Sequence, residues 1–107
     1  MTSKELCHSK SLDRNGYAPS ILIDRDYCAI CMKRVPLQRH EVFHGPYRSK
    51  SKRYGLWVSI CDECHRKVHR TDGKLDLRLK SWAQINAMTV YGWSVDEFRK
   101  QFGKNYL

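Results

Sequence analysis

Two short stretches in the middle of the chain are expected to form paired strands. The first covers residues 37–43 directly after Pro36, and the second covers residues 56–60. The first begins and ends with apolar residues and the second is almost wholly apolar, and both have the length of strands in a small sheet. The connection between them, residues 45–55, is longer than an ordinary hairpin loop, and long loops in compact domains are usually functional or disordered.

Apolar positions at helical spacing follow the second stretch. Asp62 is suited to cap a helix that ends near Gly73. A longer helix then carries one stripe up to Gly92, and the stripe consists of Leu75, Leu79, Trp82, Ala83, Asn86 and Val90. We expect this helix to cover the core, and we assign no chemistry to its tryptophan.

The segment Ser94-Val95-Asp96-Glu97 has the residues of a capping box, in which a serine side chain and a glutamate satisfy the first free N–H groups of a helix. We predict a short last helix there, with Phe98 and Phe102 facing inward.

Residues 1–20 contain Ser, Lys, Asn-Gly and Pro with little periodicity, which is typical of an arm or of loops. We expect an N-terminal arm over 1–20 and a single domain over 21–107, a size that suits one small core. Cys7 in the arm is expected to be a spare thiol, because the other four cysteines occur in pairs.

Those two pairs predict a metal site. Each has the form Cys-x-x-Cys and makes a tight turn whose thiolates can face one ion. Two such turns supply the four sulfurs of a closed tetrahedral Zn²⁺ site, here Cys28, Cys31, Cys61 and Cys64. A structural Zn²⁺ would also stabilise a core this small.

The net charge of the protein limits the kinds of partner that it is suited to bind. Twenty Lys and Arg against eleven Asp and Glu give a net charge of +9, which is the pattern of a protein that meets phosphates. No stretch pairs a basic face with a broad apolar one, so nucleic acid is favoured over a membrane. In the connection 45–55, basic residues are interspersed with tyrosines. We expect it to bind DNA backbone phosphates through Arg48, Lys50, Lys52 and Arg53. The alternative is a solvated, mobile loop.

The expected cellular compartment follows from the apolar segments of the chain. Its longest apolar runs are too short to span a bilayer, and its first residues have no apolar core of a signal peptide. We therefore expect no membrane partner and a location in the reducing cytoplasm, where cysteines bind metals more often than they form disulfides.

The histidines near the second cysteine pair allow three explanations. His65 directly after Cys64 could belong to a haem-attachment motif, but that requires export and leaves Cys28 and its partner unexplained. The histidines could instead contact phosphate on the surface of a DNA-docking zinc module. In the third explanation His65 and His69, which lie one helical turn apart on the same face, hold a second, open metal ion.

The third explanation accounts for the most residues with one mechanism. Phosphodiester hydrolysis needs a base for water and a cation that neutralises the phosphoryl and leaving oxygens. His40 and Glu41 on the first strand would complete a site for one divalent ion, Mg²⁺, Mn²⁺, Ni²⁺ or Zn²⁺. The cysteine-bound zinc would only fix the strands against the helix.

These residues resemble the HNH endonucleases of the ββα-metal superfamily, in particular a small phage- or prophage-type branch with a four-cysteine zinc site. The resemblance runs from about Tyr27 onward and rests on His40-Glu41-Val42-Phe43-His44-Gly45, Arg48, Ser51, Tyr54-Gly55-Leu56-Trp57-Val58, Cys61-Asp62-Glu63-Cys64-His65 and Val68-His69. It implies a small α+β fold, a zinc-stabilised, treble-clef-like ββα-metal core with C-terminal helices packed on it. It also implies DNA cleavage with one catalytic divalent ion, leaving 5′-phosphate and 3′-hydroxyl ends, in the cytoplasm of a bacterial host.

Residue by residue, the resemblance implies that His65 and His69 are metal ligands on the helix. The strand dyad, usually a ligand followed by a histidine base, is His40 then Glu41 here. Position makes His40 the ligand and Glu41 the base, whereas chemistry favours His40 as base and Glu41 as ligand or water-orienter. His44 is a reserve candidate. The central asparagine of the family is missing, with Gly55 in its region, so a non-catalytic nucleic-acid-binding zinc module is the alternative.

Overall fold

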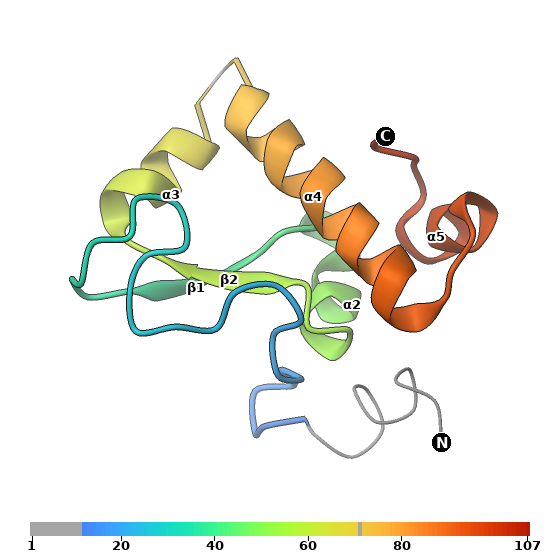
Figure 1. Ribbon diagram of the computed structural model, residues 1–107, viewed down its shortest axis with the longest axis horizontal. Coiled ribbons are helices and arrows are strands. Elements are labelled where there is room, and N and C mark those ends of the chain that lie inside the picture. Colours follow the sequence, from blue (N-terminus) through green and yellow to red (C-terminus); the bar gives the residue numbers. More distant parts are fainter. Residues whose placement is uncertain (1–11, 71) are drawn as a thin grey trace.

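The computed structural model describes residues 12–70 and 72–107, and the predicted spare thiol Cys7 lies outside them. The element order is β1 (Gln38–Glu41), a 3₁₀ turn η1 (Gly45–Tyr47), α2 (Arg48–Arg53), β2 (Trp57–Ile60), α3 (Asp62–Val68), α4 (Lys74–Tyr91) and α5 (Val95–Phe102). Figure 1 shows α3 following directly from β2, with α4 leading back from α3 towards α5. The predicted small α+β fold is confirmed.

Strands β1 and β2 form an antiparallel hairpin in which His40 is opposite Val58 and Glu41 is opposite Trp57. Neighbouring side chains on a strand point to opposite faces. Gln38 and His40 face α3, and the Gln38 side chain donates to the Asp62 carboxylate at 2.6 Å. The hairpin and α3 therefore make a ββα-like unit.

The connection between the strands is not the open loop that the sequence suggested. It folds into η1 and α2, and the buried Ser51 ties α2 to the end of the hairpin. The Ser51 hydroxyl donates to the Phe43 carbonyl at 2.6 Å and accepts from the Phe43 N–H at 3.0 Å. This segment is thus a structured part of the domain.

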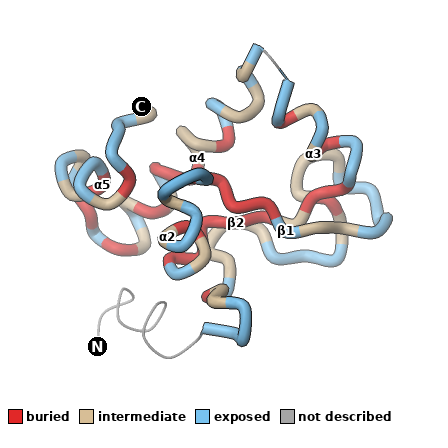
Figure 2. Tube along the Cα trace, turned by 180° about the vertical axis from the view of Figure 1, so that it is seen from behind, coloured by how far each residue is buried: buried red, intermediate tan, exposed pale blue. Residues whose placement is uncertain are grey.

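Helices α4 and α5 complete the core, whose buried positions Figure 2 marks in red along β2 and the inner sides of both helices. The predicted stop at Gly92 is confirmed, with φ of 68°. The predicted cap is also confirmed, because the Ser94 side chain accepts from the Glu97 N–H at 3.1 Å. Phe98 and Phe102 are buried as predicted.

The buried face of α4 differs from the predicted stripe. Besides Leu79 and Ala83 it contains Gln84, Ala87 and Tyr91, whereas Asn86 and Val90 are only partly buried. Gln84 is tolerated inside because its amide donates to Asn105 at 2.8 Å and accepts from a backbone N–H.

Residues 13–21 lie against the outer face of the hairpin. The Trp57 indole donates to the Ala18 carbonyl at 2.8 Å, and the Arg39 guanidinium sits 4.4 Å from the ring centre of Tyr17. Within 12–70 and 72–107, none of the helices is both long and apolar enough to cross a bilayer.

Candidate metal centres

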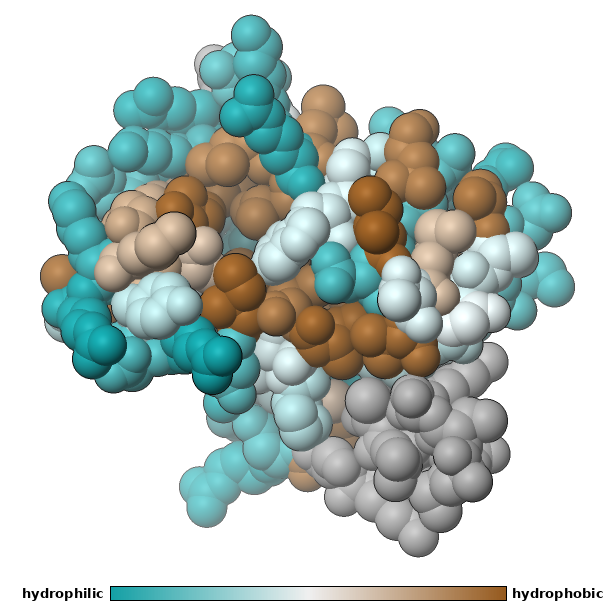
Figure 3. Space-filling view, viewed as in Figure 1, coloured by the Kyte–Doolittle hydropathy of each residue, from teal (hydrophilic) through white to brown (hydrophobic). Residues whose placement is uncertain are grey.

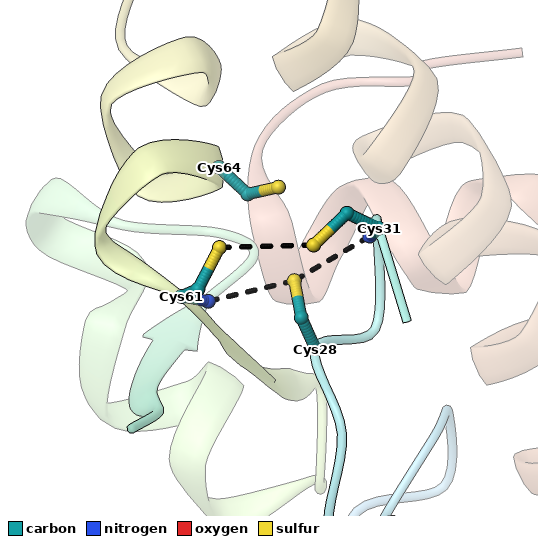
Figure 4. Close-up of side chains that lie close together, drawn as sticks. All are labelled: Cys28, Cys31, Cys61 and Cys64. Carbon is teal, nitrogen blue, oxygen red and sulfur yellow. Dashed lines mark hydrogen bonds between the residues drawn. The ribbon is translucent and has the colours of Figure 1, made fainter. Parts of the chain in front are cut away.

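The four paired cysteines meet at the junction between the first knuckle, β2 and α3. Their sulfurs all lie within 4.8 Å of one another, and Figure 4 shows them converging from two segments. The Cys31 and Cys61 sulfurs are 3.8 Å apart. That is the edge of a tetrahedron with about 2.3 Å from each sulfur to a central zinc. The donor set and spacing thus fit a closed Zn²⁺ site.

The surrounding backbone favours thiolates at this cluster. Three N–H groups donate to the Cys28 sulfur at 3.4 to 3.5 Å, those of Ile30, Cys31 and Cys61. Burial alone would raise the pKa of Cys28, but these donors outweigh it and lower the pKa to about 6. Burial raises the pKa of Cys64. A Zn²⁺ ion would resolve the conflict by stabilising all four thiolates.

A second group consists of histidines from β1 and α3. His40, His65 and His69 each place a ring nitrogen within 4.8 Å of the others. The His65 and His69 Nε2 atoms are 3.1 Å apart, as their one-turn spacing on α3 allows. The strand residue faces this pair because β1 presents it on the side of α3. The expected meeting of strand and helix histidines is present.

His40 shows why this group suits a cation. Its side chain is 4% exposed, and its Nε2 has no hydrogen-bond partner within the described part of the chain. Burial, reinforced by the rings of His65 and His69, lowers the pKa of His40 to about 4. The ring is therefore neutral at pH 7, and it carries an unsatisfied buried polar atom in a group of three imidazoles. Such an orphan is costly unless a ligand satisfies it.

Glu41 does not join the three histidines. It is on the other face of β1, 6% exposed, and its carboxylate accepts from the Arg48 guanidinium at 2.7 Å. Burial alone would raise the pKa of Glu41, but the hydrogen bond and charge of Arg48 lower it. Burial and the Glu41 charge raise the pKa of Tyr17, which lies on the same side. Glu41 is thus an ionised, firmly held carboxylate.

Both strand residues still reach one cleft, because β1 is at the edge of the two-stranded sheet. The cleft has a volume of about 450 Å³ and includes His40, Glu41, Arg48, His65 and His69 in its lining. A phosphodiester group could therefore contact the histidines and the Glu41–Arg48 pair together.

His44 and Asp76 complete the surroundings of the cleft. The half-exposed His44 ring lies 6.2 Å from the His40 ring and 6.1 Å from that of His69, centre to centre. Its Nε2 is 3.5 Å from the Asp76 carboxylate on α4, which also pairs with Lys80 at 2.8 Å. Sequence reasoning missed Asp76, because no local motif connects a helix residue with a histidine 32 positions earlier.

The four basic residues predicted to bind DNA lie on α2, and three of them have partners inside the protein. Arg48 pairs with Glu41, Lys50 donates to the Gln101 carbonyl at 2.9 Å, and the Lys52 ammonium lies 4.9 Å from the ring centre of Tyr17. Arg53 is exposed. The helix thus holds most of these charges in fixed positions.

Comparisons with protein-family models, with curated proteins and with solved structures found no match for this chain. The chemistry of the two centres therefore carries the functional argument by itself.

Proposed function

We propose that this protein is a metal-dependent DNA endonuclease of the HNH type, with a structural Zn²⁺ at the cysteines and one catalytic divalent ion at the histidines. The observation that carries the proposal is the buried, unpartnered Nε2 of His40, on a ring that lies 5.5 Å from that of His65 and 5.7 Å from that of His69, centre to centre. Three imidazoles in an open cleft leave coordination positions for water and a phosphoryl oxygen.

Under this proposal His40 is a ligand and not the base. Its Nε2 is buried without a partner in the described part of the chain, and burial lowers the pKa of the ring to about 4, so that the ring is neutral at pH 7. The neutral ring is the form that binds cations. A ring nitrogen that holds the ion cannot also accept a proton from water, which leaves the role of base to another group in the cleft.

Glu41 is then the base that accepts a proton from the attacking water. It is ionised, lines the cleft beside His40, and is oriented by its hydrogen bond to Arg48. The divalent ion would supply positive charge to the phosphoryl and leaving oxygens. Arg48 lines the same cleft, 65% exposed, and can also contact the phosphate while it holds Glu41.

The substrate is proposed to be DNA, supported by the net charge of +9 and by the basic helix beside the cleft. Arg48, Lys50, Lys52 and Arg53 are proposed to follow the sugar–phosphate backbone. Such contacts position the substrate and carry no sequence preference by themselves.

The test is nicking of supercoiled plasmid with Mg²⁺, Mn²⁺, Ni²⁺ or Zn²⁺ added to protein that holds one zinc. His40→Ala and His65→Ala should abolish nicking, and Glu41→Gln should lower its rate at least about 100-fold, the usual contribution of a general base. His44→Ala tests the reserve candidate at the edge of the same cleft, and it should keep most of the activity if Glu41 is the base.

Several outcomes would count against the proposal. DNA binding without nicking under every ion would favour the alternative, a non-catalytic zinc module that binds nucleic acid. Nicking that persists in the His40 and His65 variants would indicate a contaminant. A loss of activity in His44→Ala, with Glu41→Gln still active, would move the role of base to His44. One bound zinc and an unchanged circular dichroism spectrum would show that each variant folds.

A further inference from the structure

A second cleft lies where the end of α3 meets the start of α4, and none of the roles above uses it. It has a volume of about 300 Å³, and its lining is formed by Lys67, Arg70, Asp72, Lys74, Leu75 and Arg78. Figure 3 shows hydrophilic side chains gathered over this junction, at the top of the view.

The cleft concentrates positive charge that the protein does not neutralise. Arg70, Lys74 and Arg78 are exposed, and no carboxylate within 12–70 or 72–107 forms an ion pair with any of them. Lys74 and Arg78 are four residues apart on α4, so their charges share one helix face. Like charges at this spacing destabilise a helix, which makes the arrangement unfavourable without an anion.

The acidic residue at the cleft is already engaged. The Asp72 carboxylate accepts from the Lys74 backbone N–H at 3.3 Å, at the start of α4. The fourth basic residue of the lining, Lys67, forms an ion pair with Glu63 on α3 at 3.4 Å. Three positively charged side chains without an ion-pair partner thus remain around one concave surface. This surface lies at the N-terminal end of the 18-residue α4, where the helix dipole also favours an anion.

The position of this cleft relates it to the metal centre. His69 ends α3 and lines the histidine cleft, while Lys67 and Arg70 on either side of it in the sequence line the second cleft. Both clefts therefore take residues from the C-terminal end of α3. An extended polyanion that crosses the metal centre can reach the basic cleft by passing around this end of the helix.

We propose that the α3–α4 cleft binds the DNA backbone at a phosphate that flanks the one placed at the histidines, through Arg70, Lys74 and Arg78. This inference rests on the proposed function and adds a second contact that fixes the direction of the DNA across the protein. The contact is to phosphate, so it adds affinity and orientation without base specificity.

The test measures DNA binding in the absence of catalysis. A labelled 20-base-pair duplex is titrated with protein that holds only its structural zinc, and the dissociation constant is followed by fluorescence anisotropy at several salt concentrations. The variant is Lys74→Gln/Arg78→Gln. The matched control is Arg14→Gln/Arg25→Gln, which removes the same charge from exposed residues that line neither cleft.

We expect the Lys74/Arg78 variant to bind at least about tenfold more weakly, with the slope of log Kd against log salt reduced by about two, one for each lost phosphate contact. The control variant should change Kd less than about twofold. Equal weakening by both variants would reduce the effect to net charge and overturn the inference, and so would unchanged binding in both. Failure of the unaltered protein to bind the duplex would overturn the proposed function as well.

Discussion

The burial of His40 makes the stability of the protein depend on pH in a way that can be calculated. Its pKa is about 4 in the folded protein, against 6.5 for a free histidine. Between these values the unfolded chain binds a proton at His40 that the folded chain does not bind. The free energy of unfolding therefore falls as the pH is lowered from about 6.5 to about 4.

The size of the effect follows from the two pKa values. Each pH unit between them corresponds to about 1.4 kcal/mol, so the full loss is about 3 kcal/mol. From pH 7.5 to 5.5, where the unfolded ring takes up its proton, the loss is about 1.4 kcal/mol. The side chain is 4% exposed, so solvent screening removes little of it.

The assay is reversible urea unfolding followed by tryptophan fluorescence at pH 7.5 and 5.5, with one equivalent of zinc and no other divalent ion. His40→Gln provides the comparison, because it keeps a polar side chain that cannot titrate. The zinc-binding cysteines contribute equally to both proteins, so their pH dependence cancels in the difference. The unaltered protein should lose about 1.4 kcal/mol more than the variant.

Parallel pH profiles for the two proteins would refute this reasoning, since they would mean that His40 takes up its proton equally in the folded and unfolded states. NMR titration gives an independent check, because the His40 ring signals should show no protonation down to about pH 5 in the folded protein.

Three further substitutions test the packing that positions the site. Ser51→Ala should destabilise the protein by about 2–3 kcal/mol in urea unfolding, because it leaves the buried N–H and carbonyl of Phe43 unsatisfied. Gly55→Ala should cost at least about 2 kcal/mol in the same assay, since φ is +69° and the new Cβ would overlap the Pro19 carbonyl oxygen. Met32→Gly should raise the free energy of unfolding by about 0.5–1 kcal/mol, and the melting temperature with it, because Met32 is exposed and holds a φ of 64°. If the stability of one of these variants is unchanged, the cause stated for that substitution is wrong.

Local signals made much of the fold predictable. The end of α4 at Gly92 and the cap at Ser94 follow from residue types that act on their immediate neighbours. The position of β2 follows from a short apolar run, and that of β1 from a short segment between Pro36 and the apolar Val42 and Phe43. The meeting of the cysteines could also be foreseen, because two Cys-x-x-Cys turns have a single efficient use in a chain of this size.

What the sequence did not reveal depends on contacts between distant segments. Helix α2 is short and basic, and it is held by the Ser51 hydrogen bonds and by Lys50 on the Gln101 carbonyl. Such a helix has no apolar stripe to announce it. The pairing of Glu41 with Arg48 is also a tertiary contact. Because Glu41 follows His40 directly, the sequence suggested that both residues bind the same ion, whereas the Glu41 side chain is on the other face of β1.

The two candidate centres are joined through α3, and this connection explains why a small chain would keep both. The helix has seven residues, too few to be stable in water by itself. Its first turn is held by the Gln38–Asp62 hydrogen bond, and a Zn²⁺ ion at the sulfurs of Cys61 and Cys64 would fasten it further. His65 follows Cys64 directly, so the direction of its ring is set by the same anchoring that closes the zinc site. An ion at the histidines would in turn hold α3 against β1, which brings the second knuckle towards the first. Each ion would therefore favour the geometry that the other requires, and this coupling would be reciprocal because it acts through one shared helix.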